Sequence, residues 1–335
     1  MRPVRLYFAG PIFYPKGDRA VSLNQQITNR LVSYLYPDQL RRWCEQIEDI
    51  KGNIILDSGA FSAWMKGQEI PLDTYITYAK NAMQMAKDYN KHLRIVNLDV
   101  IPGVYGASMQ LNLVNSKENR ATINKAASKG YENLLRMKDE GITPIHVFHQ
   151  GEDFEWLEKM VKLTDYIGVS PANDMGVPAR VDWMRSVFTY LHNNNIKVKT
   201  HGFAVLMLPV LKTLPFTSVD AATWRIVAAW GSIMYPIGGF SNPDYSQFPM
   251  LFCVSERRVG KGMGTLTPEK VKQLENDGYT FEELQTFDGR CEINIRYILG
   301  LEKWVNEYRK GIKFKPVNDL FSIGRRSIIW SRCSL

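Results

Sequence analysis

Three aspartates each stand at the end of a short apolar run of the kind that forms a buried β-strand. Asp57 ends NIILD, Asp99 ends IVNLD and Asp220 ends TSVD. Carboxylates that share one pocket suit glycosyl chemistry, because one can attack the anomeric carbon while a second, with a raised pKa, protonates the leaving group. A third can accept the adjacent N–H donors of a guanine edge. Taken singly, an Asp after a strand often only caps the next helix.

Other polar or flat residues stand at the ends of similar runs. His149 and Gln150 follow IHVF, Ser170 ends YIGVS, and His201 follows KVKT. A Gln offers both a donor and an acceptor to the opposite edge of a base, and Phe61 and His201 are flat enough to stack on its faces. Glycines let the backbone approach a planar ligand closely or form tight turns, and they occur here at Gly59, Gly151, Gly168 and Gly202.

The apolar runs that carry these residues alternate with stretches of helical periodicity. Strands that alternate with helices indicate βαβ units and a parallel sheet. The eight predicted strands are Val4–Ala9, Asn53–Leu56, Leu93–Leu98, Pro144–Phe148, Tyr166–Val169, Ile196–Thr200, Thr217–Val219 and Ser232–Tyr235. We therefore predict an α/β fold, a (β/α)8 TIM barrel, whose strand ends place the polar residues around one mouth.

The length of 335 residues exceeds the roughly 250 that a single barrel takes, so we expect extra peripheral helices. The connection between Gly10 and Gly52 is expected to hold more than one helix, and Cys291–Tyr308 is predicted as a late helix outside the barrel. We assign residues 1–310 to the catalytic barrel and residues 311–335 to a basic C-terminal extension.

The charge of the chain favours a polyanionic partner. Lys and Arg number 42 against 34 Asp and Glu, a net charge of +8. Basic residues gather from Arg309 to the C-terminus and again at Arg257, Arg258 and Lys261. Each one that neutralises a phosphate releases a condensed counterion, although a solvated basic surface explains the same excess.

The cysteines and the apolar segments indicate a cytoplasmic protein. Cys44, Cys253, Cys291 and Cys333 lie far apart without a CxxC pair, which favours free thiols in a reducing compartment. No apolar run approaches the roughly 20 residues needed to cross a bilayer, and the N-terminal segment lacks a signal-peptide core. We expect no membrane partner.

The motifs, taken in order, resemble those of the tRNA-guanine transglycosylase superfamily. ILDSGAFS resembles its DSGGFQ-type motif, VFHQGED its VQGG segment, and YIGVSPA its GGLSVGE segment. THGFAV followed by TSVDAATWR resembles the segment that carries the nucleophile, and NIRYILGLE resembles the late helix. The order is the same and the spacing is similar, over residues 50–235 for the catalytic motifs.

The resemblance implies a role for each matching residue. Asp220 matches the nucleophile, Asp57 the general acid/base, and Asp99 and Gln150 the residues that recognise the base. Further substrate contacts are implied for Phe61, Gly151, Gly168, Val169, Ser170, His201 and Gly202.

Departures from the family pattern indicate its DNA-modifying branch, the phage and bacterial DpdA-type enzymes. DSGAFSAW, VDAATW and the N-terminal segments YFAG and Asn29–Pro37 resemble that branch, and the PTRxxR of the tRNA enzymes is replaced by Trp224 and Arg225. The zinc-binding CxCxxC run is missing and Ile293 stands where its His is expected, so we expect no zinc and no other cofactor. Nucleic-acid contacts are expected from Trp224, Arg225, Arg257, Arg258 and Lys261.

The resemblance thus predicts an enzyme that exchanges guanine in DNA for a free 7-deazaguanine base through a glycosyl-Asp intermediate. Three alternatives remain: a transglycosylase acting on tRNA, a non-catalytic barrel that binds nucleic acid, and a hydrolytic N-glycosidase. Retention of all three aspartates argues against the non-catalytic barrel.

Overall fold

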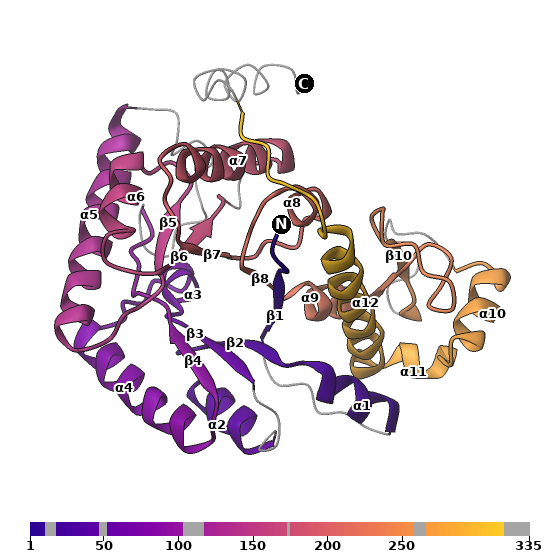
Figure 1. Ribbon diagram of the computed structural model, residues 1–335. Helices are drawn as coiled ribbons and strands as arrows, with labels where there is room; N and C mark the ends of the chain where they lie inside the picture. The colour runs from indigo at the N-terminus through magenta and orange to yellow at the C-terminus, as the bar shows by residue number, and fades with distance from the viewer. Residues whose placement is uncertain (11–17, 47–51, 103–116, 173–174, 257–265, 318–335) are drawn as a thin grey trace.

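The computed structural model describes residues 1–10, 18–46, 52–102, 117–172, 175–256 and 266–317, and Figure 1 shows its strands at the centre with helices around them. Eight parallel strands pair in the order β4-β3-β2-β1-β8-β7-β6-β5. A parallel bridge between Val96 and Ile145 joins the two outer strands. The sheet therefore closes into the predicted (β/α)8 barrel. Its strands are β1 Arg5–Ala9, β2 Asn29–Ser33, β3 Asn53–Asp57, β4 His92–Ile95, β5 His146–His149, β6 Tyr166–Ser170, β7 Lys199–Gly202 and β8 Ser218–Ala221.

The predicted set of eight strands is wrong in one member. Ser232–Tyr235 is β9, which lies outside the barrel and pairs antiparallel with β10, Met250–Cys253. The barrel strand missed in the sequence is β2, whose segment NRLVS begins with two polar residues, Asn29 and Arg30, that mask its strand character. Both are buried, and each makes a side-chain hydrogen bond: Arg30 Nη2 donates to Asn24 Oδ1 at 3.0 Å, and the Asn53 amide donates to Asn29 Oδ1 at 2.9 Å.

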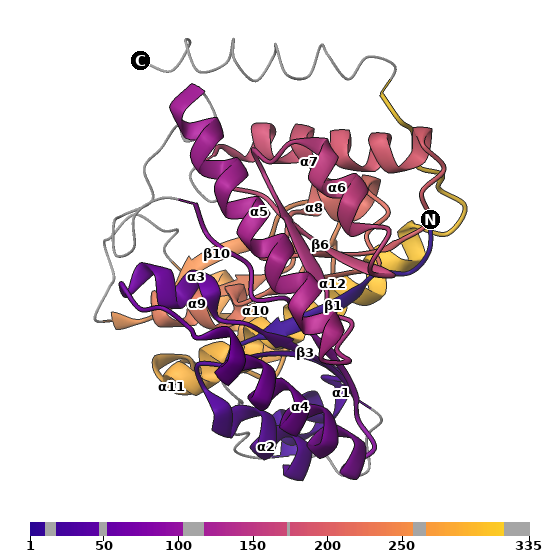
Figure 2. The same ribbon diagram turned by 90° about the vertical axis from the view of Figure 1, so that its left-hand side faces the viewer.

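The helices cover the outside of the barrel and extend past one side of it. Figure 2, turned by 90°, shows α4, α5 and α6 lying across the strands. The helices in the described residues are α1 Asp18–Gln26, α2 Pro37–Gln46, α3 Ala60–Met65, α4 Leu72–Asp88, α5 Lys117–Asp139, α6 Phe154–Met160, α7 Val177–Asn193, α8 Leu208–Thr213, α9 Thr223–Ala229, α10 Pro268–Asn276, α11 Phe281–Gln285 and α12 Phe287–Tyr308. None of these is long and apolar enough to cross a membrane.

Side chains alternate between the barrel interior and the helix layer, as the two-residue period of a strand requires. In β3, Ile55 packs inside the barrel, whereas Ile54 and Leu56 pack against the helices outside. The interior is lined by Tyr7, Ala9, Leu31, Ile55, Val96, Ile145, Val147 and Tyr166. A filled interior leaves only the ends of the barrel free to bind a ligand.

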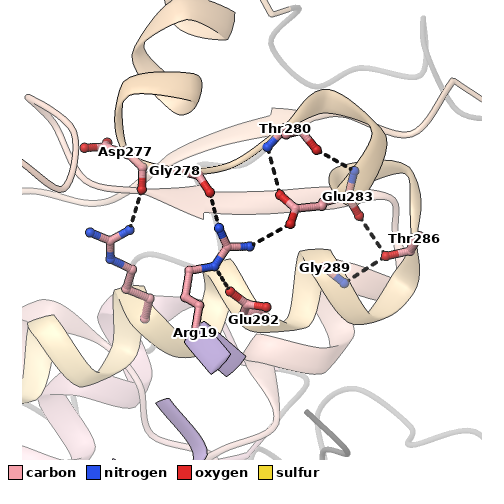
Figure 3. A network of polar contacts seen from close by, with 9 residues as sticks. Arg19, Asp277, Gly278, Thr280, Glu283, Thr286, Gly289 and Glu292 are labelled. Atoms are coloured by element: carbon pink, nitrogen blue, oxygen red, sulfur yellow. Dashed lines mark hydrogen bonds and ion pairs between the residues drawn. The ribbon is translucent and has the colours of Figure 1, made fainter. Parts of the chain in front are cut away.

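A polar network centred on Arg19 ties α1 to the C-terminal helices (Figure 3). The guanidinium of Arg19 donates to Glu292 of α12, to the Gly278 carbonyl, and to Glu283 Oε1 at 3.2 Å. Glu283 also closes a capping box with Thr280, which begins α11. The helices beyond the barrel are thereby fastened to its first α-helix.

The basic residues of the C-terminal region differ in solvent exposure where the structure describes them. Arg309, which we counted with the exposed basic residues, is fully buried, and its Nη2 donates to the carbonyls of Leu214 and Phe216 at 3.2 Å. Lys310, Lys313 and Lys315 are exposed, while Arg325, Arg326 and Arg332 lie outside the described residues. Arg309 therefore stabilises the barrel rather than adding to a basic surface.

Candidate active site

A cavity of about 390 Å³ opens at the C-terminal ends of the barrel strands. It is mostly apolar, with its polar groups drawn from β3, β5, β6 and β8 and from the segments that follow β3, β4 and β5. The predicted site residues that line it are Asp57, Phe61, Asp99, Gln150, Ser170 and Asp220. Six residues far apart in the sequence are thus brought to one cavity, and none of the described lining residues is a Lys or Arg.

Asp57 ends β3 and begins the turn into α3. Its Oδ2 accepts a hydrogen bond from the Gly59 N–H at 3.0 Å. Gly59 has a φ of 75°, and a Cβ there would come within 2.7 Å of Leu35, so the turn requires glycine. Burial, together with the negative charges of Asp99 and Asp220, raises the pKa of Asp57 to about 7. A carboxyl with this pKa can both give and take a proton near neutral pH.

Asp220 lies on β8 and is only 7% exposed. Its Oδ1 accepts hydrogen bonds from the Ala204 N–H at 2.9 Å and from His201 Nε2 at 3.3 Å. Among the described residues no donor contacts Oδ2. One oxygen of Asp220 is therefore anchored, and the other is left to react.

Asp99 is held by two donors. Its Oδ1 accepts from the Ser58 hydroxyl at 3.2 Å, and its Oδ2 pairs with His149 Nε2 at 2.9 Å. The other ring nitrogen of His149 pairs with Glu152 Oε1 at 2.9 Å. Burial opposes the charge of His149, but its bonds to Asp99 and Glu152 outweigh burial and raise its pKa to about 10. His149 is thus an imidazolium between two carboxylates.

The sequence identified His149 as a polar strand end but assigned it no role, and it did not identify Glu152. The segment HQGE could have predicted the contact between His149 and Glu152, because a His and a Glu three residues apart can meet across a tight turn. Gly151, between them, has a φ of 108°, which permits that turn. Gly151 does not line the cavity, so the turn, rather than a ligand, accounts for this glycine.

Gln150 has one half of its side-chain amide available to a ligand, whereas the sequence predicted that both halves would be. Its Oε1 accepts from the Ala172 N–H at 3.0 Å, and its backbone N–H donates to the Ser170 carbonyl. The acceptor half of the amide is therefore engaged within the protein. The Nε2 donor makes no hydrogen bond to the described residues and is the half available to a ligand.

Four predicted contact residues lie behind the cavity wall. Gly168 and Gly202 make room for packing, because a Cβ at Gly168 would lie 2.4 Å from the Phe203 ring and one at Gly202 would lie 3.0 Å from Phe216. Val169 is fully buried, and its carbonyl accepts from the Phe203 N–H. The fourth residue, His201, is also fully buried.

The prediction that His201 stacks on a base does not fit this position. The aromatic ring that lines the cavity there is Phe203, which contacts the His201 ring edge-on at a centroid distance of 4.6 Å. Phe203 follows His201 and Gly202 in the motif THGFA, so the aromatic residue that reaches the cavity stands two positions after the predicted one. Phe61, which also lines the cavity, is 40% exposed and stands at the rim.

The structure places the residues predicted to bind nucleic acid in different environments where it describes them. Trp224 is buried, and its indole N–H donates to the Ala9 carbonyl at 3.0 Å, so it fastens α9 to β1 and is not a surface contact. Arg225 is exposed, with its guanidinium 5.9 Å from the Phe287 ring. Arg257, Arg258 and Lys261 lie outside the described residues.

The residues that the resemblance aligns with a zinc site do not fit a zinc ion. Cys291 and Ile293 are packed in the apolar core. Asn294 is buried as well, and its amide bonds the Met234 N–H at 2.6 Å and the Trp224 carbonyl at 2.9 Å. Those hydrogen bonds hold β9 and α9 against α12 without a metal ligand.

Comparisons with known proteins add no family. No protein-family profile and no curated protein matches the chain. Among solved structures it is similar to a 2-keto-3-deoxygluconate aldolase of Sulfolobus sulfataricus in complex with D-KDPG, with 11% identity and a TM-score of 0.33 over 97% of this chain and 94% of that chain. It is also similar to a probable tagatose 6 phosphate kinase from Sinorhizobium meliloti 1021, with 9% identity and a TM-score of 0.33 over 98% and 92%. Similarities this weak carry no argument about function, and the barrel rests on its own strand pairing.

Proposed function

We propose that this chain is a base-exchange glycosyltransferase that replaces guanine in DNA with a 7-deazaguanine through a covalent adduct on Asp220. The observation that carries the proposal is the pair of carboxylates in one cavity with different environments. Asp220 is anchored through one oxygen, and the pKa of Asp57 is raised to about 7. A retaining glycosyl transfer needs this division between a nucleophile and a proton donor.

In the first half of the reaction Asp220 Oδ2 forms a bond to the sugar C1′ while the C1′–N9 bond breaks. The electron pair of that bond stays on guanine, which takes a proton from Asp57. In the second half the incoming base loses its N9 proton to Asp57 as N9 attacks C1′. Asp220 then leaves with its electron pair, so the enzyme returns to its starting state without an oxidant or reductant.

Base selection is assigned to Asp99 and Gln150. Each oxygen of Asp99 already accepts one hydrogen bond, and an ionised carboxylate has about four acceptor sites, so it can still accept the N1–H and the amine of guanine. The Nε2 of Gln150 can donate to O6. The apolar wall and the lack of Lys or Arg among the described lining residues favour a neutral base over a phosphate-bearing ligand.

The target base must leave a duplex to reach the cavity, because its reacting atoms are inside the helical stack. Phe61, exposed at the rim, is positioned to stack on the extruded base. The choice of DNA over tRNA rests on the resemblance of DSGAFSAW and VDAATW to the DNA-modifying branch.

The test is to incubate the protein with duplex DNA, or separately with tRNA, and a labelled 7-deazaguanine, and to analyse the nucleosides by mass spectrometry. We expect the label in DNA and free guanine in equal amount. Asp220→Asn, which preserves shape, should abolish both, and the intact wild-type protein should show a DNA adduct on Asp220.

Each alternative gives a separate result. Label confined to tRNA would support the tRNA enzyme, and guanine release without label would support an N-glycosidase. Incorporation that survives Asp220→Asn would overturn the assigned nucleophile. Binding of nucleic acid without any exchange would overturn the catalytic proposal.

A further inference from the structure

A chain of buried hydrogen bonds runs up the barrel interior to Asp220. The Tyr166 hydroxyl contacts the Ser218 hydroxyl, and Ser218 Oγ lies 2.5 Å from His201 Nδ1. The other nitrogen, His201 Nε2, lies 3.3 Å from Asp220 Oδ1. Ser218 and Asp220 point to the same side of β8 because they are two residues apart, and His201 on β7 bridges them.

The His201 ring is also held on its flanks. Its plane is nearly perpendicular to that of Tyr7, at a centroid distance of 5.6 Å, and steeply inclined to that of Phe203, at 4.6 Å. With no exposed surface, the ring has little freedom to rotate or flip. The fold therefore holds the His201 imidazole in one orientation. Neither the proton transfer nor the base recognition proposed above uses this residue.

The hydrogen bonds between Tyr166 and Asp220 can be given donors and acceptors in one consistent order. An ionised Asp220 accepts, so His201 Nε2 must carry the hydrogen. In a neutral imidazole Nδ1 then accepts from the Ser218 hydroxyl, whose oxygen in turn accepts from Tyr166. Every hydrogen bond in this order donates toward Asp220 Oδ1.

We propose that His201, backed by Ser218 and Tyr166, is a positioning residue that fixes Asp220 through Oδ1 and so makes Oδ2 the attacking oxygen. This inference rests on the proposed role of Asp220 as the nucleophile. The Ala204 N–H, 2.9 Å from the same Oδ1, is the second anchor. With both anchors on one oxygen the carboxylate cannot rotate to exchange its oxygens, and Oδ2 is aimed at C1′.

Ser218, His201 and Asp220 are the residue types of a hydrolytic triad, but the geometry excludes that use. Ser218 is fully buried beneath His201, on the side of the ring away from the cavity. No substrate carbonyl can reach its hydroxyl. The serine therefore supplies the hydrogen bond to His201 Nδ1, and the carboxylate is the group that reacts.

The first test does not depend on activity. The ¹⁵N chemical shifts of the histidine rings, with His201 assigned by its loss in His201→Gln, should show the Nε2–H tautomer in the resting protein. Ser218→Ala removes the donor to Nδ1, so it should shift the ¹⁵N resonance of Nδ1 while Nε2 keeps its hydrogen. Ser186→Ala is the matched control, since it removes another buried serine hydroxyl, which donates to the Trp183 carbonyl on α7 at 2.7 Å and contacts no residue of the relay. An Nδ1–H tautomer in the wild type would refute the relay.

The second test is the single-turnover rate of adduct formation on Asp220. A misplaced reacting group can cost roughly 100-fold, so His201→Met should lower the rate by about that factor while the affinity for the free base changes less than about twofold. His201→Gln keeps a donor near the Nε2 position and should recover all but about tenfold of the rate. Ser186→Ala should stay within about twofold of the wild type.

The two proposals fail in different ways. If the wild-type protein exchanges no base, the proposed function is wrong and the tautomer result alone decides the relay. If the wild type is active and His201→Met retains its rate, the relay is wrong and the proposed function stands. Should His201→Met fail to fold, His201→Gln and Ser218→Ala still distinguish these outcomes.

Discussion

Replacing Asp57 with asparagine should stabilise the folded protein at neutral and alkaline pH but not in acid. The pKa of Asp57 is raised from 3.8 to about 7, chiefly by burial and then by Asp99 and Asp220. A carboxyl whose folded-state pKa is raised holds its proton more tightly in the folded state, so its contribution is favourable in acid and is lost as the pH rises from about 4 to about 7. The asparagine side chain stays neutral at every pH and can still accept from the Gly59 N–H.

The size of the effect follows from the shift. Three pKa units correspond to about 4 kcal/mol, and the contact of Asp57 with the open cavity reduces this to about 2 to 4 kcal/mol. The difference in unfolding free energy between Asp57→Asn and the wild type should be near zero at about pH 4 and reach this value by about pH 8.

The assay is urea unfolding followed by tryptophan fluorescence at a series of pH values between those limits. Taking the difference between variant and wild type cancels the titration of the groups that do not interact with Asp57. Asp139→Asn, late in α5 and away from the cavity, is the control and should show no such rise. A flat difference for Asp57→Asn would refute the claim that Asp57 is a buried carboxyl with a raised pKa, and with it the assignment of Asp57 as the acid/base.

Three further predictions concern the supports of the site. Glu152→Gln removes one of the two carboxylates that keep His149 charged and should raise the KM for the free base about tenfold with little change in kcat, measured by incorporation of labelled base. Gly168→Ala places a methyl 2.4 Å from Phe203 and should cost about 1–3 kcal/mol by urea unfolding, a loss that Phe203→Leu in the same chain should partly reverse. Arg19→Ala breaks the half-exposed network in Figure 3 and should cost about 1–2 kcal/mol without changing kcat, measured by thermal unfolding and exchange activity.

The barrel was predictable from the sequence because its signal is repeated. Short apolar runs and helical stretches alternate along the chain, and an error in one run does not change the fold class. The error that occurred has a physical cause. Arg30 and Asn29 make β2 look polar, and the sequence does not show that both are buried against partners from other elements, Asn24 and Asn53.

Which residues reach the cavity was predictable in part. Position at the C-terminal end of a predicted strand places Asp57, Asp99 and Asp220 at the mouth, and the structure brings them together there. The same reasoning failed for His201 and Trp224, because a residue type does not say whether a ring faces the cavity or the core. Both are buried and hydrogen-bonded inside the protein.

The location of the proton among the three carboxylates follows from the hydrogen bonds that each receives. Hydrogen bonds and positive charges stabilise an ionised carboxylate. Asp99 is paired with the His149 imidazolium and the Ser58 hydroxyl, and Asp220 receives bonds from Ala204 and His201.

Asp57 receives only the Gly59 N–H from the described residues and faces the charges of the other two. The raised pKa therefore belongs to Asp57, and in the proposed mechanism this makes Asp57 the proton donor and Asp220 the nucleophile. This assignment depends on His149 and His201, two buried imidazoles whose partners come from other strands and loops, and so it could be made only once the fold had placed them.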